Sequence, residues 1–253
     1  MRALSYGSFL LVILLGASCK KGGGGGNSDI DLRKGLMVYL PFTGNTIDSS
    51  GNFNSVQALG STGFTADQHG RANSAYDASQ GRLLITDNGS INFDTALTVC
   101  FNFKLNTANS LQCFLGYVDN VTGFGASYSI GLTVPTSNNF QFAVQDGTGS
   151  CGTFADPAKS NNEVTNFLPN SGTWYNMVCI YHKGTNSVYI NGVLSGTQTS
   201  SGTSALFCSS SKMIVGGWWN TGPEPMDGSI DEVRLYNRVL NADEIAQLYK
   251  NFQ

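Results

Sequence analysis

The chain has 253 residues, a formal net charge of −3 and only 12% charged residues. It lacks the basic patch of a nucleic-acid-binding protein, and with two histidines and no Cys-x-x-Cys pair it does not match the usual zinc sites. Abundant Gly, Phe and Tyr, with few Glu and Lys, favour an all-β domain over a helical one.

The N-terminus has the pattern of a secretory signal peptide over residues 1–18. Arg2 precedes an apolar stretch too short to span a bilayer, and small residues follow up to Cys19. "LLGASC" resembles a bacterial lipobox, in which the cysteine becomes the lipidated first residue, although Gly16 replaces the usual leucine. The alternative is ordinary signal-peptidase cleavage near Ser18, with Cys19 an incidental thiol.

A glycine-rich tether follows over residues 19–34. "KKGGGGGNS" cannot bury apolar surface and is typical of a flexible spacer. Attachment through more than one acyl chain holds a protein on a membrane without a spanning helix. We therefore expect a bacterial cell-envelope lipoprotein, lipid-anchored on the periplasmic or outer-surface side, with residues 35–253 as its one folded domain.

Alternating apolar and polar residues, separated by turn residues, predict a series of strands. These lie at 35–42, 97–105, 128–134, 140–146, 174–182, 187–196 and 212–217. Period-two runs at this spacing indicate an antiparallel β-sandwich. Asn191-Gly192 marks a tight hairpin, because both residues tolerate positive φ. The loop-rich stretch 148–171 is interpreted as an insertion.

The end of the chain predicts a short helix. Asn241 can cap it, with Glu244 three residues later reaching back to the Asn241 amide. Ile245, Leu248 and Tyr249 then lie on one helical face.

Four stretches together resemble the laminin G-like group of the concanavalin A-like lectin/glucanase superfamily. They are "LMVYLPFTGNTIDSSGN", "GRANSAYDAS", "GTWYNMVCIYHKGTNSVYINGV" and "DGSIDEVRLYNRVLNADEIAQLY". In the strand "ALTVCFNFKL", where a tryptophan is common in the family, this chain has Phe101. The resemblance covers residues 36 to 250 and implies an all-β, antiparallel jelly-roll sandwich with a short C-terminal helix. Such folds host lectins, adhesins and hydrolases, so function depends on the site.

The related glucanases place two carboxylates on one strand, an acid and a nucleophile about 5 Å apart. This chain has no matching run. Glu163 and Glu224 stand alone in predicted loops, and Glu244 is assigned to the helix cap. Asp231 and Glu232 are adjacent, so we expect them on opposite faces of a strand. The sequence therefore predicts a protein that is not an enzyme.

The resemblance also implies a structural calcium ion where the first loop meets the last strand. Calcium takes six to eight oxygen ligands from carboxylates, carbonyls and water. The candidate ligands are Asp48, Asn45, Gly51 and Asp231. The alternative is that Asp48 forms only an Asx turn, while Asp231 pairs with Arg234 or Arg71.

Aromatic residues near loops suggest a sugar-binding surface. Trp218 and Trp219 in "GGWWNTGPEP" cannot both point into one core, so one is expected to be partly exposed. Tyr117 and Phe124 bracket a loop that could join them; the alternative is a rim packed beneath the insertion. Trp174 is assigned a structural role at the start of a core strand. Two hypotheses follow: a lectin-like lipoprotein that binds glycans, or a protein-interaction or surface-structural module without a sugar ligand.

Five cysteines follow Cys19, so at least one stays unpaired or bonds another chain. Cys151 and Cys208 lie in predicted loops and could staple the insertion. Cys100 and Cys179 sit on strands that are often neighbours in this architecture, and the alternation places both opposite the main apolar stripe.

Overall fold

The computed structural model describes most of the chain after residue 29. The described residues are 30–108, 110–118, 128–132, 140–145, 147, 151, 160–165, 167–199, 202–218 and 224–253. The signal peptide, most of the tether, Cys19, Phe124 and Trp219 lie outside these residues. None of the helical residues described forms a helix long and apolar enough to cross a membrane.

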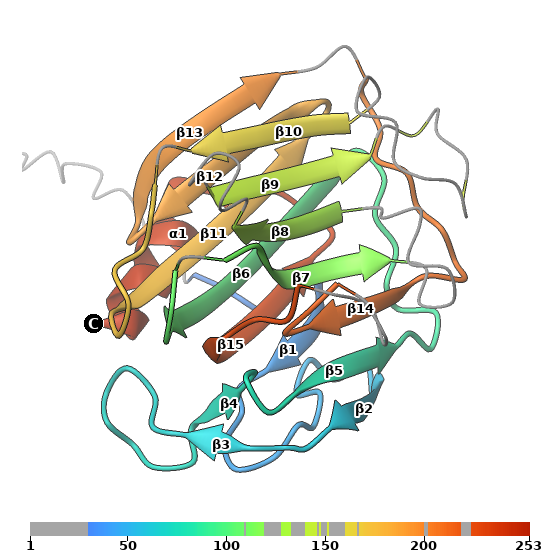
Figure 1. The fold of residues 1–253 in the computed structure, drawn as a ribbon. Helices are drawn as coiled ribbons and strands as arrows, with labels where there is room; N and C mark the ends of the chain where they lie inside the picture. The colour runs from blue at the N-terminus through green and yellow to red at the C-terminus, as the bar shows by residue number, and fades with distance from the viewer. Residues whose placement is uncertain are drawn as a thin grey trace, which may run out of the picture. The chain divides into compact units, whose positions relative to one another are not determined.

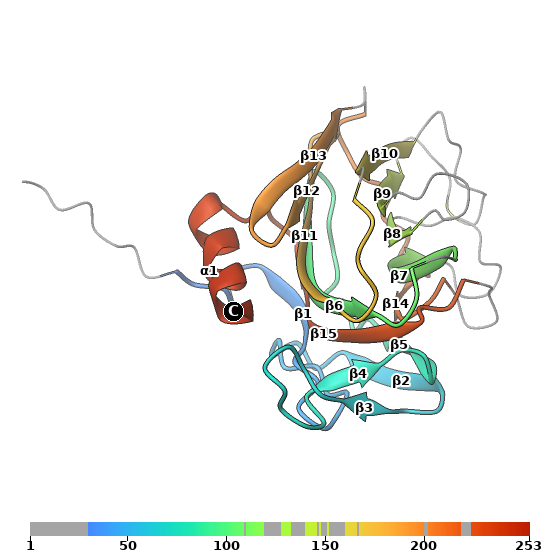
Figure 2. The ribbon, with the colours of Figure 1, turned by 60° about the vertical axis from the view of Figure 1, so that its left-hand side comes forward.

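Two antiparallel sheets face each other, as Figures 1 and 2 show, which confirms the predicted sandwich. The first sheet contains, in spatial order, β13 (Val193–Thr199), β12 (Thr185–Ile190), β11 (Trp174–His182), β6 (Ala96–Leu105), β15 (Gly228–Tyr236), β4 (Ala75–Asp77) and β3 (Phe64–Thr65), with β1 (Leu36–Leu40) paired to β15. The second sheet contains β10 (Ser160–Thr165), β9 (Phe140–Gln145), β8 (Tyr128–Leu132), β7 (Gln112–Val118), β14 (Lys212–Val215), β5 (Gly81–Thr86) and β2 (Ser55–Gly60).

An aromatic cluster between the sheets forms the centre of the core. The alternation in β6 turns Phe101 and Phe103 inward, as predicted, and both are at most 1% exposed. The Phe103 ring lies 5.1 Å from that of Phe114 in β7, which lies 5.9 Å from Phe140 in β9. Burial of one such side chain contributes about 1.5–3 kcal/mol, so these rings tie the two sheets together.

Strand β15 occupies the middle of the first sheet and contains an irregularity. It pairs with β6 along one edge, and with β4 and β1 along the other, so the first and last strands lie side by side. The register shifts between Asp231 and Arg234, and Glu232 has a φ of 53°. Ile230 and Val233 both point into the core. The two residues between them therefore share the outer face, and the prediction that Asp231 and Glu232 face opposite ways is wrong.

Helix α1 (Ala242–Phe252) lies on the outer side of the first sheet (Figure 2). It begins at the predicted capping box, in which Asn241 and Glu244 each accept a hydrogen bond from the other's backbone amide. Arg238 forms an ion pair with Glu244 at 2.7 Å, which fixes the start of the helix. Ile245 and Leu248 are buried against the outer face of the sheet, as their spacing predicts.

Several strands escaped the sequence analysis because they do not alternate. Every residue of β7 is buried, so its pattern has no polar face. Strand β10 lies within the stretch interpreted as an insertion, and it contains Glu163, which had been expected in a loop. The hairpin between β12 and β13 is confirmed, with φ values of 51° at Asn191 and 76° at Gly192.

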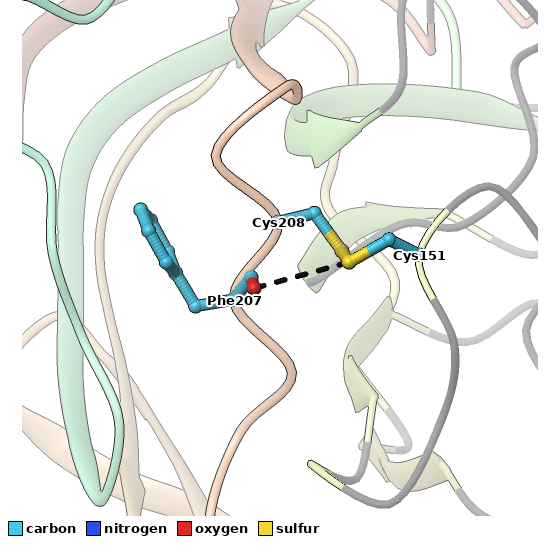
Figure 3. Close-up of a disulfide and its surroundings, with 3 residues drawn as sticks. All are labelled: Cys151, Phe207 and Cys208. Carbon is cyan, nitrogen blue, oxygen red and sulfur yellow. Dashed lines mark hydrogen bonds between the residues drawn. A yellow bond between two sulfur atoms is a disulfide. The ribbon is translucent and has the colours of Figure 1, made fainter.

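One disulfide joins Cys151 to Cys208, 57 residues apart, which confirms that pair (Figure 3). The Cys151 sulfur also lies 3.9 Å from the carbonyl oxygen of Phe207, whose ring stacks on Tyr117 in the core. Cys100 lies on the outer face of the first sheet and Cys179 in the main core. The prediction of a shared face is wrong for Cys179, which is on β11 directly opposite the inward-facing Val99.

We predict that Cys208→Ser lowers the free energy of unfolding by about 4 kcal/mol, because the bond closes a long loop in the unfolded chain. Urea denaturation of the oxidised protein and the variant measures the difference. Cys179→Ser, which breaks no disulfide, is the matched control. Equal stabilities of wild type and Cys208→Ser under non-reducing conditions would contradict the assignment.

Candidate functional site

A polar pocket lies on the outer face of the first sheet, beside the C-terminal end of α1. It encloses about 210 Å³ and is lined by side chains from β1, β6, β11, β15, the 66–74 loop and the helix. Pockets for drug-sized molecules hold roughly 300–1,000 Å³, so this one suits a smaller polar group.

Two asparagines form the pocket floor. Asn102 on β6 and Asn176 on β11 are direct cross-strand partners, and the Asn176 side-chain amide donates to Asn102 Oδ1 at 2.8 Å. They are only 3% and 4% exposed. Asn176 Oδ1 and Gln68 Oε1 are buried, and neither receives a hydrogen bond from any described residue. A buried acceptor without a donor costs about 1–3 kcal/mol, so both oxygens favour a ligand that donates.

One wall of the pocket is a closed cluster of Tyr39, Glu232 and Arg234. The Tyr39 hydroxyl donates to both carboxylate oxygens of Glu232, at 3.2 and 3.0 Å, and Arg234 forms an ion pair with the same carboxylate. The Arg234 guanidinium lies 4.2 Å from the centre of the Tyr39 ring. Burial raises the pKa of Tyr39 to about 12 against the opposing effect of Arg234, and the negative charge of Glu232 adds to the rise. The phenol therefore stays protonated and keeps Glu232 in place.

Asp231 is adjacent to this wall but does not line the pocket. It is 1% exposed, and its Oδ1 receives no hydrogen bond from the residues that the structure describes. Burial and then the neighbouring Glu232 raise its pKa to about 8, so Asp231 is mostly protonated at neutral pH. Arg71 pairs with Asp67 and Arg234 with Glu232, so neither expected partner of Asp231 makes an ion pair with it.

The carboxylate of Asp48 is fully engaged by the protein. It accepts five hydrogen bonds, from Tyr39 N, Ser50 N, Ser50 Oγ, Asn54 N and Asn54 Nδ2, all at 2.8–3.0 Å. The bond from Ser50 N is the expected Asx turn. A carboxylate has about four lone-pair sites, so Asp48 has none left for a cation. No group of three or more His, Cys, Asp or Glu suited to a metal occurs among the described residues. Calcium at Asp48, Asn45, Gly51 and Asp231 stays a prediction, and the hydrogen-bonded loop does not fit it.

The predicted aromatic surface does not assemble at the described residues. Tyr117 is fully buried in the core, where its ring stacks on Tyr128 and Phe207, so its assignment to a surface loop is wrong. It lies in β7, a strand that the alternation pattern does not reveal. Trp218 is half-buried and packs against Leu84, Val118 and Ile214 on the second sheet.

Trp174, to which the sequence pattern assigned only a structural role, is a binding candidate in the structure. It lies on β11 two residues before Asn176, so both side chains lie on the outer face of the first sheet. The Trp174 ring is half-buried, and Lys104 Nζ lies 5.3 Å from its centre. Tyr175, between them, packs on Phe103 in the core. The alternation of β11 could have placed Trp174 on the outer face, because Trp174 and Asn176 alternate with the inward-facing apolar residues of that strand.

A family model described as the concanavalin A-like lectin/glucanases superfamily, of the laminin G type, matches residues 77–246. The chain belongs to this superfamily. No curated protein matches its sequence significantly.

Solved structures share the superfamily fold at low identity. They include the binding domain of botulinum neurotoxin DC in complex with SialylT (16% identity, TM-score 0.62) and with rat synaptotagmin II (17%, 0.64). The binding domain of Paraclostridial mosquitocidal protein 1 is also similar (17%, 0.65). Each match covers 88% of this chain and 53% of the other, so the chain spans about half the length of these structures.

We predict that Asp231→Asn flattens the pH dependence of stability between about pH 4 and pH 8. The pKa of Asp231 is higher in the folded state, so its stabilising contribution is complete below pH 4 and is lost as pH rises to about 8. One pKa unit corresponds to about 1.4 kcal/mol, so the change exceeds about 1 kcal/mol. Denaturation at pH 5 and pH 8.5 measures it. An unchanged pH dependence in the variant would show that Asp231 titrates normally.

We predict that Asp48→Ala lowers the free energy of unfolding by about 2–3 kcal/mol in EDTA, because buried donors such as Asn54 N lose a charged acceptor. Thermal and urea unfolding, each with EDTA and with calcium, measure the effect. Ser49→Ala, an exposed neighbour in the same loop, is the control. A loss of stability that appears only when calcium is present would favour the ion site instead.

Proposed function

We propose that the protein is a non-catalytic, carbohydrate-binding (lectin-like) lipoprotein of the bacterial cell envelope. One observation carries the proposal: buried, unsatisfied oxygens and a half-buried tryptophan lie on the same face of the first sheet. Sugar hydroxyls can donate to Asn176 Oδ1 and Gln68 Oε1, while the apolar face of a ring packs on Trp174. The membership of a lectin-containing superfamily supports this function without assigning a ligand.

The arrangement of the carboxyl groups argues against glycoside hydrolysis. A retaining glycosidase needs two carboxyl groups that both reach the sugar. Asp231 and Glu232 share the outer face, yet Glu232 is held by Tyr39 and Arg234, and Asp231 does not line the pocket. Neither is available as a nucleophile or as an acid in contact with substrate.

The N-terminal sequence supports an anchored location. The apolar segment, the lipobox-like "LLGASC" ending at Cys19 and the polyglycine stretch fit a lipid anchor with a spacer. A spacer of this kind would hold the sandwich away from the membrane, where its outer sheet face can meet polymers of the envelope or its surroundings.

A protein-interaction or surface-structural module is the second candidate. Ile47 and Phe53 in the opening loop are 67% and 86% exposed, and Val193 and Leu194 in the β12–β13 hairpin are 69% and 52% exposed. The binding domains with similar folds include one in complex with rat synaptotagmin II. Exposed apolar side chains favour contacts with another protein when they gather in one patch.

We predict that the mature chain binds a glycan and that Asn176→Ala and Trp174→Ala each weaken binding by at least about 1 kcal/mol, roughly five-fold in Kd. A glycan array identifies the ligand, and calorimetry compares the variants. Trp218→Ala is the matched control on the other sheet. Loss of binding in Trp218→Ala alone would move the site to the second sheet. If the array shows no bound glycan, and the wild type captures a defined envelope protein that Phe53→Ser does not capture, the second candidate is favoured. Release of reducing sugars from a glycan would contradict the non-catalytic assignment.

A further inference from the structure

The hydrogen-bonding groups of the pocket are unevenly distributed between floor and rim. Asn176 Oδ1 on the floor and Gln68 Oε1 on the 66–74 loop are acceptors without donors among the described residues. The carboxylate of Glu232 already accepts bonds from Tyr39 and Arg234. The floor therefore selects ligand groups that donate, such as hydroxyls.

The rim carries a cation held in a fixed position. The Arg71 side chain lines the pocket, is 64% exposed, and its Nε donates to Asp67 Oδ2 at 2.6 Å. Asp67 is in turn held by the backbone amides of His69 and Arg71, each at 2.9 Å. The two terminal nitrogens of Arg71 make no hydrogen bond to the described part of the chain. A guanidinium with its outer edge available matches a carboxylate in a bidentate pair.

The other charges around the pocket leave room for an anion. Arg234 and Glu232 neutralise each other, and Asp67 balances the charge of Arg71, so an anion would be recognised by the two terminal nitrogens of Arg71 rather than by a net positive charge. Asp231 is 1% exposed and does not line the pocket, so its carboxyl group does not face a bound ligand. Lys104 adds a second cation beside Trp174, further along the same sheet face.

We infer that the pocket recognises an acidic sugar, a hexuronic acid residue, with its hydroxyls on the oxygens of Asn176 and Gln68 and its carboxylate on Arg71. A longer acidic oligosaccharide would continue over Trp174 and place its next carboxylate near Lys104. The inference rests on the proposed function, because it assumes that a glycan enters this pocket.

The test compares sugars that differ only in the carboxylate. Calorimetry of the mature chain with oligogalacturonides, their methyl esters and the matching neutral galactose oligomers should show at least ten-fold tighter binding of the acid. Binding should weaken as salt is raised from 20 to about 200 mM, since screening acts on the exposed Arg71. Arg71→Gln should remove the ten-fold preference and Arg71→Lys only part of it, while Lys212→Gln on the second sheet should change nothing.

The outcomes distinguish a failure of the acidic-sugar assignment from a failure of the proposed glycan binding. Equal binding of acid and ester, lost in Asn176→Ala but kept in Arg71→Gln, would overturn the acidic-sugar assignment and leave glycan binding in place. No binding of any oligomer or of free galacturonate would overturn both. Binding of free galacturonate that depends on Arg71, with no oligomer bound, would support the chemistry of the pocket and contradict glycan capture. Because the acid and the ester are compared on the wild type, the test does not depend on the folding of a variant.

Discussion

Strand β15 pairs with one strand, β6, along one edge and with two separate strands, β4 and β1, along the other. Along β6 it pairs from Gly228 to Tyr236, with one shift of register. On the other edge β4 pairs with Ser229 and Ile230, and β1 with the residues from Val233 onward. Asp231 and Glu232 fall at the gap between these partners. An extra residue is accommodated there as a bulge, because a continuous ladder would not allow it.

The bulge determines the chemistry of the outer face. Without it, the strict alternation of β15 would bury Glu232 in the apolar core and expose Val233. With it, Glu232 reaches Tyr39 and Arg234, and Asp231 lies in the row formed with Asn102 and Asn176 across three strands. This polar row is under-satisfied, since both Asn176 and Asp231 keep an oxygen without a partner among the described residues. The free-energy cost of leaving these buried oxygens without hydrogen bonds is expected where a surface binds a ligand rather than where it only stabilises the fold.

The sequence allowed prediction wherever local chemistry decides the structure. The alternation in β6, the Asn191-Gly192 turn and the capping box of Asn241 and Glu244 depend on residues close in the chain, and all three are confirmed. The position of Tyr117 could not be predicted, because β7 is buried on both faces and lacks a period. The common face of Asp231 and Glu232 depends on which strands flank β15, a tertiary fact that no local pattern contains. The pocket could not be predicted for the same reason, although the alternation of β11 does place Trp174 and Asn176 on one face.

The helix makes the site a preformed one. The capping box and the ion pair of Arg238 with Glu244 fix where the helix begins. The β12–β13 turn lies against Tyr249 on the side of the helix. A side chain at Gly192 would come within 3.0 Å of the Tyr249 ring, so the turn and the helix are in close contact. Leu248 and Phe252 then reach the pocket from a helix that cannot easily shift. Little ordering is left to occur on binding, so a small polar ligand can be held without the entropic cost of closing a loop.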